Sequence, residues 1–496
     1  MIDREVKQKL LGRLMSAAAL IGALGLAGLE PSQAEDAQPR RNVFRRMAAR
    51  LSGRTQAPRA IDSEIEQIQA QESELPAFER ADDKERPFEE PGASQAPNFS
   101  DTPGPETQPA FERADDKETA PEEPASAWTL TNLFDDDAGN NVLKDNGWKL
   151  SGHSAWGYQN APDGSFDGHG PFLSQQGWGQ FNLNQQYLYI EKIANGKDGL
   201  DWGVRFDVMY GTQGFEGQSF GNIDAGHWDY LNGFDHGAYN WALPQLYGEV
   251  AYGDLSVKLG HFYTIVGYEV VPSTGNFFMS RQLTFFNSEP FNHTGALATY
   301  KANDKLTLLG GWVLGWDTGF YQYNQGNSFL GGATYAVDEK TTFVYSMAAG
   351  NFGWRGQGAI NSMILSRQWT EKFATVAQFD VFNSNLVLAD GTPADFNTSA
   401  GGFTPRDSVS FITYAFYDLN SKVKGGVRYE WYKPDGTSYN TFTFGLNYKP
   451  YSNVIIRPEA RIMWAPGNQN IYTGAHGYSG QLFNQTVFGI DAIVTF

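Results

Sequence analysis

Segments of about ten residues in which apolar and polar side chains alternate recur over the C-terminal two thirds of the chain. In the segment 423–432, Val427 and Trp431 stand on one face, whereas Arg428 and Glu430 stand on the other. Successive side chains of a β-strand point to opposite faces, so this period of two predicts strands with one apolar and one polar face. The pattern therefore favours an all-β fold.

Three features favour a lipid bilayer over water as the surroundings of the apolar faces. Many segments last 9–11 residues, enough to cross a bilayer at a tilt, whereas ordinary strands average about 5–6 residues. Aromatic residues such as Trp202 and Tyr210 end the apolar faces, as interfacial girdles require. The chain also ends in an amphipathic segment, 488–496, that closes on Phe496, the assembly signal expected of bacterial outer-membrane barrels.

We predict a transmembrane antiparallel β-barrel of about 16 strands, preceded by a disordered N-terminal arm. An even number of strands is required if a closed antiparallel barrel has both termini on one side. The predicted strands are 148–158, 181–191, 202–210, 242–252, 255–262, 295–301, 306–316, 328–337, 341–349, 360–369, 373–382, 408–417, 423–432, 440–449, 454–464 and 486–496.

The connections between these segments alternate in length. Every second connection is short and rich in Asp, Asn and Lys, which tight turns prefer. The others are mostly long, notably 159–180, 211–241, 263–294, 383–407 and 465–485. Outer-membrane barrels have short periplasmic turns and long outer loops. This alternation predicts an outer-membrane location with the N-terminal arm and the C-terminus in the periplasm.

Composition excludes several other classes of protein. The chain contains no cysteine, which excludes disulfide scaffolds, cysteine-ligated metals and thiol catalysis. A mean hydropathy of -0.44 argues against a bundle of membrane-spanning helices. The net charge of -19 argues against a nucleic-acid partner, which would require a basic footprint.

The N-terminal quarter differs from the rest. Residues 1–34 resemble a signal peptide, with basic residues, an apolar stretch and small residues before a cleavage site after Ala34. Residues 35–127 are proline-rich and charged, contain the sequence PAFERADDKE twice, and are expected to form a disordered arm. Its basic stretch, 40–59, is either a peptidoglycan or lipid contact or a solvated tether. Residues 128–496 are expected to form the barrel domain.

The connection 263–294 is unusual because it is far more apolar than the other long loops. It contains several phenylalanines, including Phe277, Phe278 and Phe285, which a loop in open water would not expose. Two interpretations follow. The connection is a lid packed on neighbouring loops, or it folds into the lumen and narrows it.

The segment from Gly260 to Val271, together with Ser280-Arg281 and 289–295, resembles the OmpL-like β-barrel porins. The resemblance covers roughly 148–496, and Met279 and Asn292 depart from the usual Tyr and Thr. It implies a pore in the outer-membrane lipid through which small hydrophilic solutes or ions diffuse passively, and it leaves a homotrimer open. The family has no established catalytic motif to carry over, so the resemblance implies a pore and no particular substrate.

The polar strand faces and the unusual connection supply the candidate site residues. If the apolar faces contact lipid, charged residues on the opposite faces line the pore: Lys149, Arg205, Asp207, Lys424, Arg428, Glu430, Lys449, Arg457, Glu459 and Arg461. The candidate constriction residues are Tyr268, Glu269, Arg281, Glu289 and His293. One basic wall facing Glu269 and Glu289 would set up a transverse field. Alternatively, Asp207, Glu430 and Glu459 neutralise these bases.

Two rival functions belong to other classes. A membrane-embedded hydrolase requires a nucleophile beside a histidine, but His153, His261 and His293 have no nucleophile at a supporting spacing. We therefore predict no catalytic, cofactor or metal site. The second rival is a barrel without a channel that acts through its long loops as a binding or adhesion protein.

Overall fold

A computed structural model describes residues 129–135, 141–160, 181–220, 228–230, 232–236, 238–388, 390–398, 404–465 and 483–496. The predicted signal peptide, the arm and most of the connections 159–180 and 465–485 lie outside the described residues, so those predictions stay untested.

The described residues form one antiparallel sheet of seventeen strands. Strands β4 and β5 both pair with β3, so they are two parts of one interrupted strand. Counted in this way, the barrel has sixteen strands, as predicted. The strands are β1 (Trp148–Gln159), β2 (Phe181–Lys192), β3 (Asp201–Gly211), β4 (Asn240–Ala242), β5 (Leu246–Tyr252), β6 (Leu255–Tyr263), β7 (Asn292–Asn303), β8 (Leu306–Val313), β9 (Asn327–Asp338), β10 (Thr341–Asn351), β11 (Gln357–Gln368), β12 (Phe373–Ser384), β13 (Asp407–Asn420), β14 (Val423–Pro434), β15 (Tyr439–Tyr451), β16 (Val454–Trp464) and β17 (Gln485–Thr495).

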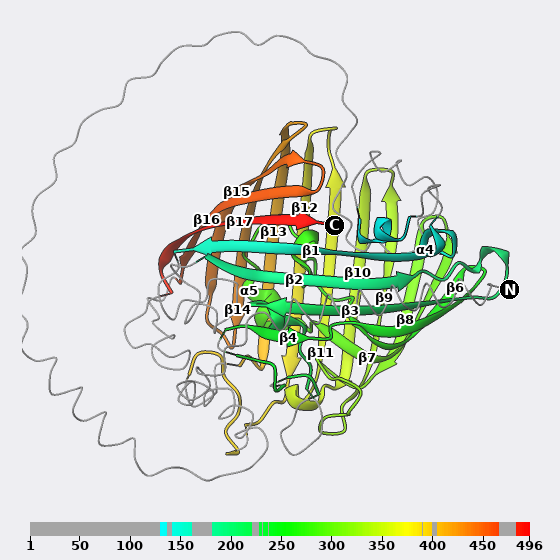
Figure 1. Ribbon diagram of the computed structural model, residues 1–496. Coiled ribbons are helices and arrows are strands. Elements are labelled where there is room, and N and C mark those ends of the chain that lie inside the picture. The colour runs from blue at the N-terminus through cyan, green and yellow to red at the C-terminus, as the bar shows by residue number, and fades with distance from the viewer. Residues whose placement is uncertain are drawn as a thin grey trace, which may run out of the picture. The chain divides into compact units, whose positions relative to one another are not determined.

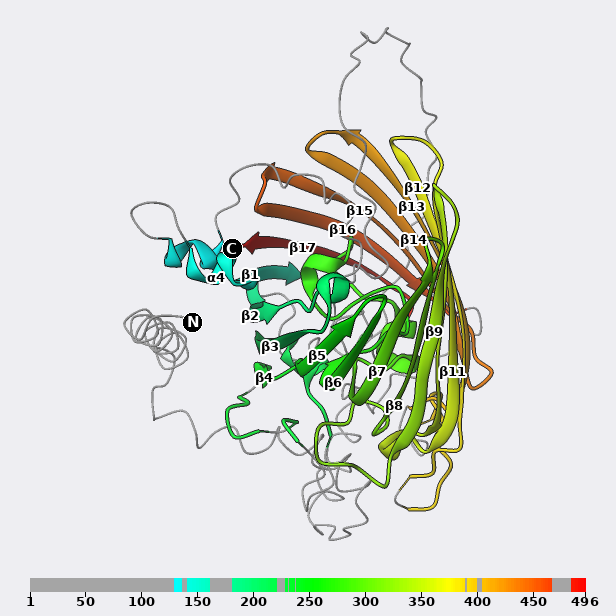
Figure 2. The same ribbon diagram turned by 90° about the vertical axis from the view of Figure 1, so that its right-hand side faces the viewer.

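The sheet closes on itself because β1 pairs with both β2 and β17. His153 lies opposite Thr495 across the closing seam, and Phe496 continues the contact by exchanging backbone hydrogen bonds of 2.7 and 3.0 Å with Gly152. Figure 1 shows β1, β2 and β3 crossing in front of β10–β14, and Figure 2 follows β15, β16 and β17 into β1 and β2. A closed barrel with no free strand edge confirms the predicted fold class.

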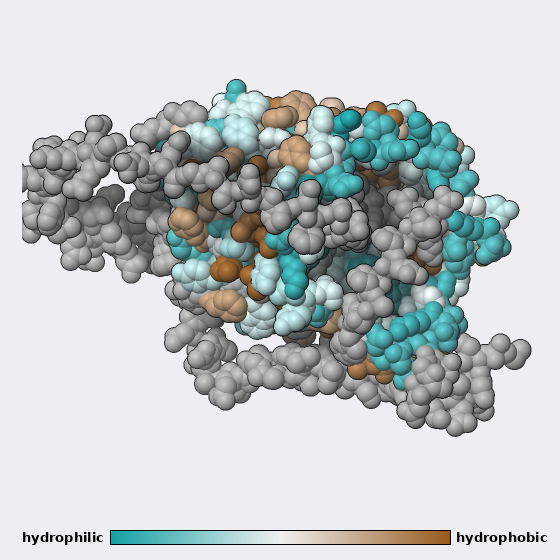
Figure 3. All heavy atoms as spheres, turned by 90° about the horizontal axis from the view of Figure 1, so that it is seen from above, coloured by the Kyte–Doolittle hydropathy of each residue, from teal (hydrophilic) through white to brown (hydrophobic). Residues whose placement is uncertain are grey.

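Alternation of side chains gives the wall an apolar outer face. Val427 and Phe444, at predicted apolar positions, are 38% and 46% exposed, whereas Arg428 and Glu430 on the opposite face are fully buried. Exposed hydrophobic residues lie among hydrophilic ones on the face seen in Figure 3. Among the described residues, no helix is long and apolar enough to cross a bilayer.

Helical segments are short and lie outside the strands. They are η2 (Leu130–Phe134), α4 (Val142–Asp145), η3 (Gly196–Asp198), η4 (Gly214–Gly217), η5 (Ser273–Gly275), α5 (Leu283–Ser288) and η6 (Gly353–Arg355). Both η5 and α5 belong to the connection between β6 and β7.

Several strands extend beyond the predicted bounds, mainly toward the long connections. Strand β12 covers Phe373–Ser384 instead of 373–382, and β7 begins at Asn292 instead of residue 295. Alternation in the sequence marks the part of each strand that has one apolar face. Backbone pairing continues past that part, where neither face is apolar.

A cation placed on the outer face should destabilise the barrel according to its depth. Phe444 lies near the middle of β15, so Phe444→Arg should lower the free energy of unfolding in phospholipid vesicles by about 2–4 kcal/mol. Tyr451, the last residue of β15, offers the control: Tyr451→Arg should cost about 0–1 kcal/mol. Equal costs at both positions would contradict a lipid-facing outer surface.

Candidate functional site

The connection between β6 and β7, residues 264–291, is called the inserted loop below. Its two ends are adjacent, because Tyr263 and Asn292 lie opposite each other in the sheet and Thr264 N donates to Phe291 O over 3.0 Å. Between these ends the chain runs through η5 and α5 along the inner side of the wall. In Figure 1, α5 lies next to β14, which it contacts.

Arginines on the wall donate hydrogen bonds to the inserted loop. Arg428 on β14 donates to Oε1 of Glu269 over 2.5 Å and to the carbonyl oxygen of Ser280 over 2.8 Å. Arg457 on β16 donates to the carbonyl oxygen of Asn276 over 2.6 Å. A buried carbonyl group without a strand partner must find a donor elsewhere, and these guanidinium groups provide it.

Glutamates on the same strands accept hydrogen bonds from the backbone of the inserted loop. Glu430 on β14 accepts from the backbone N–H groups of Leu283 and Thr284 over 2.9 and 2.8 Å, where α5 begins. Glu459 on β16 accepts from the N–H groups of Met279 and Ser280 over 2.8 and 3.2 Å. The charges of β14 and β16 therefore hold the loop by its main chain.

Aromatic contacts hold the same part of the loop. The ring of Phe277 lies over Gly426 of β14, where a Cβ would come within 2.4 Å of the ring, so only glycine leaves room for it. Phe277 also packs on Phe416 of β13, and Tyr268 packs on Tyr414 of the same strand, each with ring centres 4.9 Å apart.

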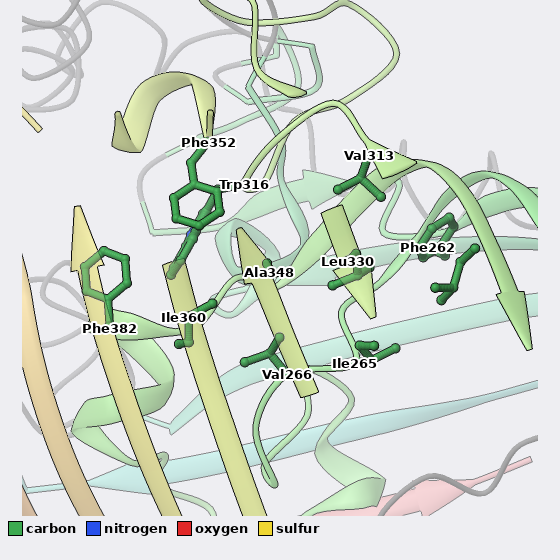
Figure 4. Packing of buried hydrophobic residues seen from close by; sticks show 11 residues of the cluster. Phe262, Ile265, Val266, Val313, Trp316, Leu330, Ala348, Phe352, Ile360 and Phe382 are labelled. Carbon is green, nitrogen blue, oxygen red and sulfur yellow. The ribbon is translucent and has the colours of Figure 1, made fainter. Parts of the chain in front are cut away.

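Ile265 and Val266, at the start of the loop, belong to an apolar cluster on the inner side of β6–β12. Figure 4 shows these two side chains beside residues that project from the wall strands. The wall residues of the cluster include Leu297, Val313, Leu330, Ala348, Ile360 and Phe382. Burial of this surface in a barrel interior requires a covering segment, and the loop supplies it.

The loop also contacts β2. Gln185 donates to the carbonyl oxygen of Val271 over 2.7 Å and accepts from the N–H group of Ser273 over 2.9 Å. Contacts with β2, with β8–β13 and with β14–β16 place the inserted loop inside the barrel. These contacts contradict the other interpretation, in which the connection is a lid that packs only on neighbouring loops.

The candidate pore-lining residues fall into three groups. Five of them lie against the inserted loop and are at most 8% exposed: Arg428, Glu430, Arg457, Glu459 and Arg461. Arg205 and Asp207 pair with each other on β3 over 2.7 Å. Lys149, Lys424 and Lys449 lie near strand ends beside the short turns. Contact of any of these residues with a solute stays a prediction.

Of the three carboxylates expected to neutralise the wall bases, Asp207 pairs closely with Arg205, Glu430 lies 3.9 Å from Arg461, and Glu459 accepts hydrogen bonds from the inserted loop. The two closest partners of the other arginines are different carboxylates. Arg457 pairs with Asp491 over 2.5 Å, and Arg428 pairs with Glu269 over 2.5 Å. Glu269 therefore faces the basic wall as predicted.

Two other candidate residues are placed differently from the prediction. Glu289 does not face the basic wall but accepts a hydrogen bond of 2.6 Å from Gln378 on β12. His293 lies in β7 rather than in the loop, fully buried, with Nδ1 2.8 Å from Gly315 O and Nε2 3.0 Å from Thr264 Oγ1. The reason is strand pairing, which begins at Asn292 and brings His293 into the wall.

Arg281 of the inserted loop and Glu216 of η4 form a further buried pair. Their closest nitrogen and oxygen atoms are 3.9 Å apart, and neither side chain is exposed. Burial raises the pKa of Glu216 in η4 to about 8, although the positive charge of Arg281 opposes that shift. The candidate constriction residue Arg281 also donates to Val271 O over 3.0 Å, and this hydrogen bond joins two parts of the inserted loop.

Asp317, in the connection between β8 and β9, accepts hydrogen bonds from the N–H groups of Phe291 and Asn292 over 2.6 and 3.1 Å, and burial raises its pKa to about 7. The unfolded chain releases this proton near pH 4, so native stability should fall as pH rises from about 4 to about 7 and then level off. Asp317→Asn keeps an acceptor and suits the backbone φ of 46°. Relative to wild type, the variant should gain up to a few kcal/mol across this window in chemical unfolding. A constant difference from pH 4 to 8 would contradict the assignment.

The structure brings one serine and one histidine together. Ser219 Oγ lies 3.4 Å from His261 Nε2, but Oγ donates to Asn292 Oδ1 over 2.7 Å and both side chains are fully buried. His261 Nδ1 faces the hydroxyl of Thr294 over 2.7 Å rather than a carboxylate. This pair has the geometry of a structural contact rather than of an activated nucleophile.

A closed sixteen-stranded barrel with a long loop folded inside is the architecture of porin-type barrels. The sequence matches the family described as "Putative beta-barrel porin-2, OmpL-like" over residues 148–496. The chain belongs to this family of β-barrel porins, which confirms the resemblance found in the sequence.

Solved structures of similar fold share little sequence with this chain. The anion-selective porin from Comamonas acidovorans has 10% identity and a TM-score of 0.44, with 70% of this chain and 99% of the porin covered. The outer-membrane channel DcaP of Acinetobacter baumannii has 9% identity and a TM-score of 0.46, with 73% and 99% covered. A mutant Rh. blastica porin has 11% identity and a TM-score of 0.40, with 70% and 100% covered. No curated protein matches the chain.

Proposed function

We propose that this protein is a non-enzymatic outer-membrane porin, a water-filled channel for passive diffusion of small hydrophilic solutes or ions. The observation that carries the proposal is the inserted loop, which is held inside a closed barrel by charged side chains of β14 and β16. A loop held there reduces the cross-section left for water. We therefore expect a constricted channel, with the inserted loop as its narrowest part.

Neutralised wall charges support weak ion selectivity. Arg428, Arg457 and Arg205 each have a carboxylate partner within 2.7 Å, so little net charge remains to set up a transverse field. Lys149, Lys424 and Lys449 lie at the strand ends beside the short turns, where an ion at the periplasmic mouth meets their charge; the nearest carboxylate to Lys424 is that of Asp418, at 3.8 Å. We propose that these lysines, rather than the buried arginines, set the preference for anions or cations.

The location follows from the same architecture. The short turns and the C-terminus lie at one end of an outer-membrane barrel, which we assign to the periplasm together with the N-terminal arm. The arm is then in reach of peptidoglycan, and a homotrimer is the assembly we propose by analogy with other porins.

Planar-bilayer recording tests the function directly. Protein refolded in detergent and added to one side should produce stepwise ohmic current increments. Reversal potentials in a salt gradient should report weak selectivity that changes when Lys149, Lys424 and Lys449 are replaced by glutamine. Absence of ohmic steps at every voltage, from protein whose refolding is verified by circular dichroism, would favour the binding or adhesion function instead.

A further inference from the structure

The inserted loop and β12 each contribute one buried carboxyl group to the same place in the barrel. Glu289 lies in the loop directly after α5, and Asp380 lies on the inner face of β12. Both residues are only 2% exposed. Protons or neighbouring residues have to balance the charges of two such groups, because water cannot reach them.

One amide group holds the two carboxyl groups together. Nε2 of Gln378, which is also on β12, donates to Oε1 of Glu289 over 2.6 Å and to Oδ2 of Asp380 over 2.8 Å. Oε1 of Gln378 accepts from Nε2 of Gln282 over 3.0 Å, so both hydrogens on the Gln378 nitrogen remain for the carboxyl groups. The amide keeps the two groups adjacent but brings no positive charge.

Glu289 and Asp380 also have a hydrogen bond to each other. An ionised carboxyl group only accepts hydrogen bonds, so a bond between two carboxyl groups requires a proton on one of them. The hydroxyl group of Ser362, opposite Asp380 on β11, supplies a further donor. A neutral acid beside a carboxylate accounts for these contacts, whereas two carboxylates would repel each other.

The charged groups around the pair favour retention of this proton. Glu269 in the loop and Glu430 on β14 act on the pair, and both carry carboxyl groups. The arginines beside them, Arg428 and Arg461, lie 2.5 and 3.9 Å from these two glutamates. Neither member of the pair itself forms an ion pair with a residue in the described ranges.

Strand β13 brings hydroxyl groups toward the pair, as β11 does. Ser410 lies opposite Asp380, and the hydroxyl group of Tyr414 donates to Glu269 over 2.9 Å. Burial, together with the negative charge of Asp380, raises the pKa of Glu289 well above its usual range. These surroundings oppose the loss of a proton from Glu289.

A glycine in the first half of the loop makes room for the glutamate. Gly267 has a φ of 89°, and a Cβ at this position would overlap the carboxyl group of Glu289. The carboxyl group therefore lies between the backbone of the loop and the side chains of β12.

We propose that Glu289 and Asp380 share a single proton, and that this proton fastens the C-terminal end of the inserted loop to β12. With the proton in place, the pair carries one negative charge and a hydrogen bond to a charged acceptor, which is stronger than a bond between neutral groups. Once the proton is released to solvent, two carboxylates face each other with Glu269 and Glu430 nearby. The attachment of the loop to β12 therefore depends on pH.

The shared proton should make the native state less stable as pH rises. The unfolded chain releases its carboxyl protons near pH 4, whereas the native pair keeps one proton at higher pH. Over that range the native state binds one more proton than the unfolded state, so the unfolding constant should rise about tenfold per pH unit. Glu289→Gln replaces the shared proton by an N–H donor. The ratio of the wild-type unfolding constant to that of Glu289→Gln should therefore rise about tenfold per pH unit.

Infrared spectroscopy of protein refolded in detergent detects the proton directly. At about pH 9 the wild-type spectrum should contain the band of one protonated carboxyl group per chain. The buried acids Glu216 and Asp317, with pKa values of about 8 and about 7, are then mostly ionised. Glu289→Gln and Asp380→Asn should each remove the whole band, whereas Glu249→Gln, which removes a buried carboxyl group on β5, should keep it.

Three results would overturn the proposal. Absence of the band from the wild-type spectrum would show that both carboxyl groups are ionised, and this result needs no variant that might fail to fold. Survival of half of the band in each of the two variants would show two separate protons. An unfolding constant with the same pH dependence in wild type and Glu289→Gln would show that the proton does not fasten the loop. None of these measurements uses ionic current, so the proposal can fail while the channel function stands.

Discussion

Replacement of residues 265–290 by a two-residue Asn-Gly turn should raise the single-channel conductance several-fold. The physical reason is that the inserted loop occupies the interior of the barrel. Without the loop, a barrel of sixteen strands is wide enough for an aqueous channel. The replacement is sterically simple, because Thr264 and Phe291 are already joined by a backbone hydrogen bond at the ends of paired strands. A two-residue turn connects such strands without changing their register.

The shortened protein should also unfold at a lower temperature, because apolar residues such as Leu330 and Ile360 lose their cover. A matched control trims the tip of the connection between β12 and β13, where Leu388 N donates to Thr392 O over 2.8 Å. That change should leave the conductance close to the wild-type value. An unchanged conductance after removal of the inserted loop would show that the loop does not set the width of the channel.

Arg428→Met should lower the free energy of unfolding by about 3–5 kcal/mol, because it leaves the buried carboxylate of Glu269 without its cation. Both side chains are at most 5% exposed, so water cannot replace the guanidinium group. The substitution also removes the donors to the carbonyl oxygen and the hydroxyl group of Ser280.

The double variant Arg428→Met/Glu269→Gln should recover a large part of this loss, since removal of both members of a buried pair is often close to neutral. Urea unfolding in detergent micelles gives the four values of the cycle. Arg367→Met provides a surface control: Arg367 and Asp338 are 3.4 Å apart but 38% and 51% exposed, and their pair should contribute at most about 1 kcal/mol. A double variant no more stable than Arg428→Met would show that the pair is not the main contribution of Arg428.

The strands of this protein could be predicted from the sequence because each wall residue points either outward or into the barrel. Positions such as Val427 and Arg428 differ in environment by a single step along the chain, so a period of two in hydropathy reports directly which face points outward. The same rule places Ser362 and Asp380 on the inner face, although neither was singled out as a site residue. A lone serine or aspartate at an inward position carries no signal of its own until its neighbours across strands are known.

The inserted loop was predictable as an unusual segment but not in its contacts. Its apolar composition showed that Phe277 and Phe278 had to be buried, whereas the wall residues that bury them, from Val344 to Phe416, lie on strands far along the chain. The expected position of Glu289 opposite the basic wall was wrong for the same reason. The loop turns between Glu269 and Glu289 so that the first meets Arg428 and the second meets β12.

The sequence by itself determined the all-β class, the sixteen strands, the outward and inward faces of each strand, and the end of the barrel that carries the short turns. These are local properties, fixed by alternation and by turn residues within about ten positions of each other. Only the tertiary structure decided that the loop lies inside the barrel, that β14 and β16 hold its backbone, and that Glu289 meets Asp380. Those contacts join segments far apart in sequence, and they depend on how a closed sheet curves around the loop it encloses.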